Sequence, residues 1–245
     1  MDARRTDRLA PGTAHLWVAD LANVDELAVE GYQPLLSEEE LERAQRFRFQ
    51  RDRVSFVVSH GLLRTALTWA VPDVRPEHWM FTKTPEGRPE ISVPGMIPRP
   101  RFSISHARGL VACVITADSD CGVDVEFLMP LTDLQALSDR VLSPQERFHV
   151  AGLPDAERLS SFFRRWTLKE AYAKARGLGM SLPFERLSFG WNEDEIRLHI
   201  EPHLDDGGPW YFEQWRTPEG YVIAVALRCG IGECRRVVYH PDSPS

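Results

Sequence analysis

Two short segments carry the residue types that could do chemistry. Residues 122–126 (Gly-Val-Asp-Val-Glu) have the apolar alternation of a strand, so Asp124 and Glu126 project from the same face. Neighbouring carboxylates repel each other unless a cation or a shared proton lies between them. Residues 166–174 (Trp-Thr-Leu-Lys-Glu-Ala-Tyr-Ala-Lys) read as a helix that adds a third carboxylate, Glu170. Three carboxylates suit a hard cation such as Mg²⁺, which commonly carries substrate phosphates, so the two segments predict phosphoryl-type chemistry.

The helix that contains Glu170 has an apolar stripe, and charged residues continue that stripe at its end. Apolar residues recur at i, i+3, i+4 and i+7, namely at Leu159, Phe162, Phe163 and Trp166. The same stripe continues onto Lys169, Glu170, Ala173 and Lys174. A simple alternative is that Glu170 and Lys174 form an i,i+4 ion pair on a solvated face, worth ~0.3–0.5 kcal/mol. Local rules tend to break at functional sites, and the nearby Asp-x-Glu strand favours a site over this alternative.

Composition indicates a globular protein with a small, local basic region. The chain has 245 residues, 43% of them hydrophobic and 27% charged, which allows one large domain or two small ones. A net charge of −7 argues against a nucleic-acid binder. Between positions 43 and 53, however, five arginines are opposed only by Asp52. This patch suits one small polyanionic ligand, although each arginine could equally cover apolar surface with its stem at a solvated helix end.

The sequence predicts a cytoplasmic protein without a membrane segment. Residues 1–12 are polar and lack the apolar region of a secretory signal, and no stretch approaches the ~20 apolar residues of a membrane span. The four cysteines, at positions 113, 121, 229 and 234, contain no Cys-x-x-Cys pair. We interpret them as reduced thiols and not as a zinc site or a disulfide framework.

An internal repeat organises the chain into two halves. Leu142-Ser143 stands 106 positions after Leu36-Ser37, and Ser161-Phe162 stands 106 positions after Ser55-Phe56. Gly109 and Gly220, 111 positions apart, each precede an apolar, strand-like run. The repeat predicts an N-terminal half at 1–118 and a C-terminal half at 119–245, related by a pseudo-twofold axis with a shared cleft.

The expected fold class is α+β, with helices followed by strands in each half. Ser37, with Glu40 at the capping-box position, predicts one helix that runs on to residues 55–56, and Ser143-Pro144 starts another. The predicted strands are 15–19, 102–105, 110–117, 122–127, 186–190, 195–200, 210–215, 221–227 and 235–239. A long βαβ alternation, a Gly-x-Gly-x-x-Gly segment and a P-loop are all absent.

Five segments together resemble the Sfp-type 4′-phosphopantetheinyl transferases. In chain order they are Gly87-Arg88-Pro89, Phe102-Ser103-Ile104-Ser105-His106, Gly122-Val-Asp-Val-Glu126, Trp166-x-x-Lys169-Glu170-Ala171-x-x-Lys174 and Gly177-Leu-Gly179-x-Ser181-Leu182-Pro183. The Asp-x-Glu segment alone is weakly specific, whereas all five in this order and spacing are strongly specific. The resemblance covers about residues 37–239, and the tryptophan and alanine around Lys169-Glu170 are typical of the W/KEA subgroup.

The resemblance implies an enzyme that moves the phosphopantetheine arm of coenzyme A onto a serine of an apo acyl or peptidyl carrier protein. The products are the holo carrier and 3′,5′-ADP, and the ligand lies in the cleft between two similar halves. Asp124, Glu126 and Glu170 would hold Mg²⁺, Glu170 would also take the serine proton, and Lys174 would stabilise the leaving phosphate. The expected coenzyme A contacts, on the 3′-phosphate and adenine side and at the pyrophosphate, are Arg43, Arg53, Arg88, Ser105, His106, Asp124, Lys169 and Lys174.

The chain departs from the family pattern at two positions. Relatives often carry a basic residue where this chain has Glu40, and an arginine where it has Ser55. Arg53 or Arg51 could substitute for that arginine as a contact of the 3′-phosphate. We interpret His60 as structural and Trp166 as a core residue.

Two other functions stay open from the residues alone. A metal-dependent phosphodiesterase would also use Asp, Glu and Lys near a metal, although the acidic net charge and the absence of a Glu-x-Lys element after Asp124 count against it. A non-catalytic binder of coenzyme A or of the carrier is disfavoured by the intact acidic and lysine residues. Two halves in one chain predict a monomer, while the carrier could belong to fatty-acid, polyketide or nonribosomal-peptide synthesis.

Overall fold

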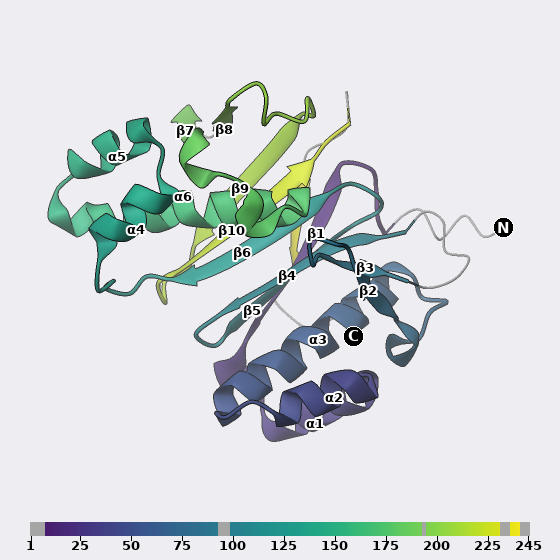
Figure 1. Cartoon of the computed structure of the whole chain (residues 1–245). Coiled ribbons are helices and arrows are strands. Elements are labelled where there is room, and N and C mark those ends of the chain that lie inside the picture. The colour runs from purple at the N-terminus through teal and green to yellow at the C-terminus, as the bar shows by residue number, and fades with distance from the viewer. Residues whose placement is uncertain (1–7, 93–98, 193–194, 231–235, 241–245) are drawn as a thin grey trace.

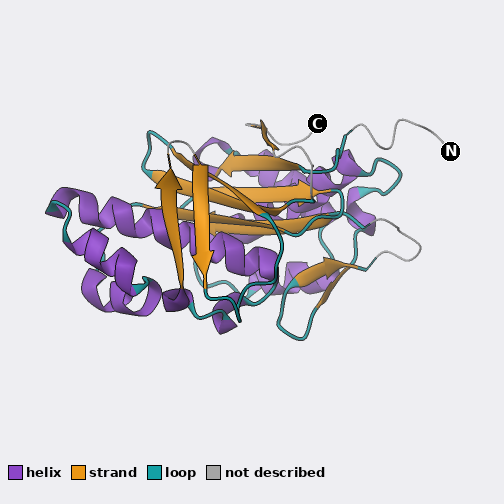
Figure 2. Ribbon diagram, turned by 90° about the horizontal axis from the view of Figure 1, so that it is seen from above, coloured by secondary structure: helices purple, strands orange, loops and turns teal. Residues whose placement is uncertain are grey.

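Two β-sheets packed face to face, with helices on both outer sides, make up the molecule (Figures 1 and 2). This computed structural model describes residues 8–92, 99–192, 195–230 and 236–240. The first sheet has the order β11-β1-β5-β4, with β1 Thr13–Asp20, β4 Arg101–Ala107, β5 Leu110–Thr116 and β11 Arg236–His240. The second has the order β6-β10-β9, with β6 Cys121–Phe127, β9 Trp210–Arg216 and β10 Tyr221–Arg228. The predicted α+β class is confirmed.

Each half adds its own helices and a small hairpin to its sheet. The N-terminal half contributes α1 Glu26–Tyr32, α2 Glu38–Gln45, α3 Gln50–Ala70 and the hairpin β2 Phe81–Lys83 with β3 Pro89–Ile91. The C-terminal half contributes α4 Leu134–Val141, α5 Pro144–Ala151, α6 Asp155–Arg176 and the hairpin β7 Leu187–Asn192 with β8 Glu195–Ile200. In Figure 1, α3 covers one side of the paired sheets and α6 the other.

The repeat seen in the sequence is a repeat of structure. The helices α2 and α5 have the same length and start 106 positions apart, and each begins with a capping box, Ser37 with Glu40 and Ser143 with Glu146. The long helices α3 and α6 follow them. The tight turns before β5 and β10 each hold a glycine in the left-handed region, Gly109 at φ 101° and Gly220 at φ 99°, which explains why both repeats need glycine there.

Three buried clusters hold the layers together. Side chains from β1 and β5 meet those from β6 and β10 between the two sheets, including Leu16, Val114, Val123 and Val225. On the outer faces, α3 packs on the first sheet and α6 on the second. Strands β4 and β6 also contact each other across the halves through two serines of β4: the Val123 and Val125 amides donate to Ser103 Oγ and Ser105 Oγ at 3.2 and 3.3 Å.

The structure corrects several sequence-based expectations. The helix expected from Ser37 to Phe56 is divided into α2 and α3, because residues 46–49 leave the helical path. The helix α1 and the hairpin β2–β3 were not predicted. The strand β11, which the sequence places within residues 119–245, pairs in parallel with β1 in the first sheet.

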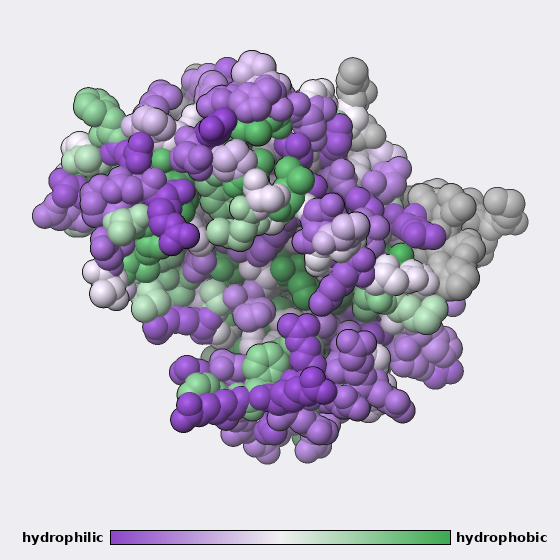
Figure 3. Space-filling model, viewed as in Figure 1, coloured by the Kyte–Doolittle hydropathy of each residue, from purple (hydrophilic) through white to green (hydrophobic). Residues whose placement is uncertain are grey.

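The surface agrees with the composition. The helical layer of the N-terminal half, at the bottom of Figure 3, is mostly hydrophilic. Among the described residues, no helix combines the length and apolar composition that crossing a bilayer requires.

Candidate active site

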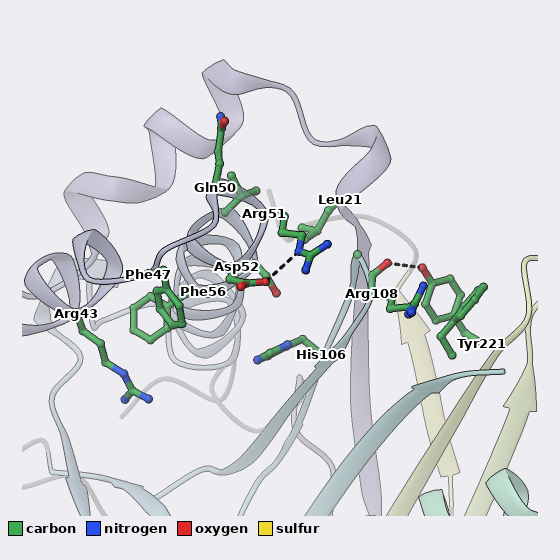
Figure 4. Close-up of a pocket in the computed structure, with 14 residues that line it drawn as sticks. Leu21, Arg43, Phe47, Gln50, Arg51, Asp52, Phe56, His106, Arg108 and Tyr221 are labelled. Carbon is green, nitrogen blue, oxygen red and sulfur yellow. Dashed lines mark hydrogen bonds and ion pairs between the residues drawn. The ribbon is translucent and has the colours of Figure 1, made fainter. Parts of the chain in front are cut away.

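A cavity of about 530 Å³ lies between the two halves and brings most of the predicted site residues together. From the N-terminal half it is lined by Arg43, Phe56, Ser59, His60, Lys83, Pro89, Ile104, Ser105 and His106. From the C-terminal half it is lined by Asp124, Val125, Glu126, Trp166, Glu170 and Lys174. A neighbouring cavity of about 1100 Å³, shown in Figure 4, shares Arg43, Phe56 and His106 with it, so the two cavities adjoin at these residues.

Close packing of α6 on β6 positions the side chains that the sequence predicts for the site. A Cβ atom at Gly122 would lie 1.9 Å from the Ala171 carbonyl oxygen, so only glycine lets the helix approach this strand. Trp166, Glu170 and Lys174 stand four residues apart on α6, which places them on one helix face, and all three line the cavity. The charged end of the apolar stripe therefore faces the cleft at Glu170 and Lys174, as predicted.

Asp124 and Lys174 form the centre of the site. Lys174 Nζ donates to Asp124 Oδ1 at 2.7 Å and to Ser105 Oγ at 2.9 Å, and the Ser105 hydroxyl donates to the same Oδ1 at 3.0 Å. Asp124 is only 5% exposed, and its Oδ2 atom is buried without a hydrogen-bond partner among the described residues. A buried carboxylate oxygen without a partner is costly, which indicates that something else contacts it in the working protein.

The charge of Asp124 acts on the other two carboxylates, those of Glu126 and Glu170. Burial and the charge of Asp124 raise the pKa of Glu126 to about 7, although Trp166 Nε1 donates to its Oε1 at 2.9 Å. Burial and Asp124 also raise the pKa of Glu170. The Asp124 carboxylate thus destabilises the charged forms of both glutamates, and this end of the cavity is short of positive charge. A divalent cation would supply that charge.

The three carboxylates have the right chemistry to bind a metal ion, but their side chains are not arranged around one point. Within the described ranges, no group of three or more His, Cys, Asp or Glu side chains is arranged closely enough to hold an ion. Asp124, Glu126 and Glu170 nevertheless line one cavity, and the orphaned Oδ2 of Asp124 is an available ligand atom. Hard oxygen donors of this kind are those that Mg²⁺ takes.

The prediction that Lys169 contacts the pyrophosphate is wrong. Its side chain is fully buried in the core of the C-terminal half, away from the cavity. Its Nζ donates to the Glu146 carboxylate at 2.5 Å and to the carbonyl oxygens of Val141, Phe184 and Leu187 at 2.7 to 2.8 Å. An ammonium group has three protons, so four acceptors leave it nothing to offer a ligand.

Two further expected ligand contacts are occupied by protein. Arg88 Nη1 donates to the Ala175 carbonyl at 2.8 Å and to Asp120 at 3.2 Å, so it fastens the hairpin β2–β3 to the end of α6. Arg88 does not line either cavity of the cleft. The single proton of the Ser105 hydroxyl is committed to Asp124. We therefore interpret both residues as organisers of the site.

The basic end of the cleft contains Arg43 and His106 but not Arg53. Figure 4 shows Arg43 from α2 and His106 from β4 beside the larger cavity, with Arg51 paired to Asp52 at its rim. Arg53 lines a separate depression between α1, α2 and α3, so the structure does not bring it to the site. Ser55 does line the larger cavity, together with Arg43 and His106. Burial and the charge of Lys174 lower the pKa of His106.

Two cavity residues were missed or misread from the sequence. Trp166 packs on the core as expected, but its indole also holds Glu126, a role that its position four residues before Glu170 could have indicated. His60 lines the cavity, and its Nδ1 lies 2.8 Å from Glu40 Oε1. No sequence signal connected His60 with Glu40, because they lie on different helices.

Comparison with known proteins identifies the family of the chain. A family model described as "4'-phosphopantetheinyl transferase, N-terminal" matches residues 28–119, and the model of the 4'-phosphopantetheinyl transferase superfamily matches residues 120–226. The 4'-phosphopantetheinyl transferase HetI of Nostoc sp. is 34% identical over 221 residues, covering 87% of this chain and 86% of that protein.

A second transferase and one solved structure are similar to the chain at lower identity. The 4'-phosphopantetheinyl transferase Sfp of Bacillus subtilis is 24% identical over 220 residues, covering 88% of this chain and 87% of that protein. A crystal structure of a holo-(acyl-carrier-protein) synthase from Bacillus anthracis, in complex with CoA (3',5'-ADP), is 21% identical and covers 45% of this chain and 96% of that one, at a TM-score of 0.39. With both halves matched by models of one family, and with a 34% identical relative over most of its length, this chain belongs to the 4'-phosphopantetheinyl transferase superfamily and is an enzyme of the Sfp type.

Proposed function

We propose that the enzyme transfers the 4′-phosphopantetheine arm of coenzyme A to a serine of an apo carrier protein and releases 3′,5′-ADP. The observation that carries the proposal is the Lys174–Asp124 pair, set in a cavity that Glu126 and Glu170 also line. A base, a cation and an acidic cluster within one cavity are what an alcohol attack on a pyrophosphate requires.

Glu170 is the proposed general base. Its raised pKa makes it a better proton acceptor than an ordinary glutamate, and it faces the cleft into which the carrier serine would reach. As the serine oxygen bonds to the phosphorus that carries the pantetheine arm, its proton passes to Glu170. The bond from that phosphorus to the bridging oxygen breaks, and 3′,5′-ADP leaves with the electron pair.

Lys174 is the proposed stabiliser of the leaving phosphate. It stands one helical turn beyond Glu170, so both side chains can address one phosphorus atom. Asp124 and Ser105 hold its ammonium group in position. Asp124, Glu126 and Glu170 would hold Mg²⁺, which when bound supplies charge neutralisation at the pyrophosphate.

The opposite end of the cleft is the proposed site of the nucleotide portion. Arg43 supplies positive charge beside the larger cavity, and His106 adds a ring nitrogen. Charge-assisted contacts from such residues to a phosphate are worth ~1.5–3 kcal/mol each. The active species would be a monomer, because the cleft is built from the two halves of one chain.

The test is to incubate the protein with coenzyme A, Mg²⁺ and an apo carrier protein and to weigh the carrier. A mass increase of one phosphopantetheine group supports transfer. Coenzyme A cleavage without modification of the carrier would indicate a phosphodiesterase, and coenzyme A binding without either reaction would indicate a non-catalytic binder. Asp124→Ala and Glu170→Ala should each abolish transfer with the fold retained. Glu195→Ala, an exposed glutamate on β8, serves as the matched control.

A further inference from the structure

His60 stands in the cavity with one ring nitrogen used and the other available. Its Nδ1 lies 2.8 Å from Glu40 Oε1, and its ring packs on Phe56 with the centroids 4.1 Å apart. The side chain lines the cavity and is 21% exposed. No hydrogen bond to Nε2 is formed within the described part of the chain. The Glu40 carboxylate thus selects the tautomer with hydrogen on Nδ1 and leaves Nε2 as the polar atom that can meet a ligand.

Glu40 is a stable anion at neutral pH. Burial opposes its ionisation, but hydrogen bonds from His60 and the Ser37 amide, with the charge of Arg64, lower the pKa of Glu40 to about 2. Arg64 Nη2 donates to Glu40 Oε2 at 2.7 Å. A fixed carboxylate against one side of an imidazole favours the protonated ring, provided that an anion is available on the other side.

The charges around the cavity separate into a basic end and an acidic end. The remaining titratable groups that line it are Arg43 from α2, Lys83 from β2, His106 from β4, Asp124 and Glu126 from β6, and Glu170 and Lys174 from α6. All of those from the N-terminal half are basic, whereas all three carboxylates come from the C-terminal half. A phosphate monoester dianion would be drawn to the basic end and a metal-bound pyrophosphate to the acidic end.

We propose that His60 is a ligand-binding residue that contacts the 3′-phosphate of coenzyme A and takes up a proton from solvent when the ligand binds. The inference rests on the proposed function and adds a regulation to it, because affinity for coenzyme A then depends on pH. Glu40 does not line the cavity, but its carboxylate holds the His60 ring in place there. No bond is made or broken beyond the proton transfer to Nε2.

The proposed uptake of a proton by His60 sets the direction in which pH changes the affinity for coenzyme A. Histidine changes charge in the neutral range, so binding is favoured at lower pH and weakens as pH rises. A contact that raises a pKa by one unit on binding changes affinity by about tenfold across the titration. A phosphate monoester loses its last proton near pH 6, so the ligand itself is almost fully ionised above pH 7.

The experiment is isothermal titration calorimetry of the full-length protein with coenzyme A and with dephospho-coenzyme A, between pH 7 and pH 8.5. Titrations in buffers of different ionisation enthalpy give the protons taken up on binding. We expect uptake with coenzyme A that exceeds the uptake with dephospho-coenzyme A, together with an affinity for coenzyme A that falls by up to about tenfold as pH rises. Groups common to both ligands cancel in this comparison.

Three variants assign the proton to His60. His60→Gln should abolish the difference in proton uptake and weaken coenzyme A binding at pH 7. His60→Arg keeps a permanent charge beside Glu40, so it should bind coenzyme A tightly at pH 8.5 and lose the pH dependence. His203→Gln, at an exposed histidine outside the cavity, should behave as the wild type. Thermal melting of each variant verifies the fold.

The outcomes separate the inference from the proposed function. Equal proton uptake with the two ligands would overturn the inference, and so would a difference that persists in His60→Gln, because another group would then carry the proton. Failure of the wild type to bind coenzyme A or to modify a carrier would instead overturn the proposed function.

Discussion

The same sequence motif, a capping box, occurs in both halves, but its glutamate has a different role in each. Each begins a short helix with a serine and a glutamate in a capping box, and in each the glutamate reaches beyond its own helix to the long helix that follows. Glu146 is 2% exposed, holds the ammonium of Lys169 and accepts the Phe189 amide at 2.8 Å. Glu40 binds Arg64 on one oxygen and His60 on the other.

The difference lies in what the second partner faces. In the C-terminal half all partners of the glutamate lie in the core, so the charge cluster ties α4, α5, α6 and β7 together. In the N-terminal half His60 opens onto the cavity. A buried charge network thus serves packing in one half and presents a titratable group to the site in the other. One residue exposed to a cleft is enough to give a helix face a role in ligand binding. The same arrangement can therefore serve stability in one half of a duplicated fold and ligand binding in the other.

The largest expected effect comes from breaking the buried cluster of the C-terminal half. Lys169→Met leaves Glu146 and several carbonyls without their cation, and removing one partner of a buried pair typically costs ~3–5 kcal/mol. Urea denaturation should show a loss of unfolding free energy of that order. Lys174→Met is the matched control, because Lys174 is partly exposed in the cavity. It should abolish transfer with a smaller loss of stability, because Ser105 still donates to Asp124 and burial raises the pKa of that carboxyl, which can then take up a proton. Equal destabilisation by the two variants would contradict the assigned roles.

A second comparison concerns the glycines that allow close packing in each half. An added Cβ at Gly122 would meet backbone atoms of α6, whereas at Gly61 it would meet the Tyr32 side chain at 2.2 Å. Backbone cannot move aside as a side chain can. Gly122→Ala should therefore cost ~1–3 kcal/mol and lower transfer, because Glu170 and Lys174 would be displaced from Asp124. Gly61→Ala should destabilise less and spare activity. The measurements are thermal melting and carrier modification.

The lowered pKa of Glu40 predicts how the stability of the fold changes at acidic pH. Its pKa in the folded protein, about 2, lies below the ordinary value of 4.5. The ionised group therefore stabilises the fold above pH 4.5, and this contribution is lost as pH falls toward 2. Glu40→Gln should be less stable than the wild type at pH 7, and the gap should narrow as pH falls from 4.5 to 3. Urea titrations at several pH values measure it, and a gap that stays constant over that interval would argue against the depressed pKa.

The smallest expected effect tests the basic end of the cleft. Ser55 lines the larger cavity beside Arg43 and His106, so an arginine at this position would add positive charge to the basic end. Ser55→Arg should tighten coenzyme A binding by about tenfold, the value of one charge-assisted contact, and leave dephospho-coenzyme A nearly unchanged. The measurement is the dissociation constant of each of these two ligands for the wild type and for Ser55→Arg. A uniform change for the two ligands would show that Ser55 does not face the 3′-phosphate.

Much of the fold was predictable because its signals are local. The capping boxes, the left-handed glycines before β5 and β10, and the alternation in strands such as β8 act within a few residues of sequence. The division between α2 and α3 was missed because the basic run at positions 46–49 interrupts the helix without a proline or glycine to mark the break. The pairing of β11 with β1 was also missed, since partners more than 200 residues apart leave no local pattern.

The amino-acid sequence by itself determined which residues of β6 and α6 form the proposed site, because Asp124 with Glu126 and Glu170 with Lys174 follow the periods of a strand and a helix. Only the tertiary structure decided which charges reach the cavity. Lys169 and Glu170 are adjacent in sequence, yet the helical rotation of about 100° per residue sends one into the core and the other toward the cleft. Likewise, Glu40 and His60 become a pair only where α2 crosses α3, because contacts between elements depend on packing and not on spacing along the chain.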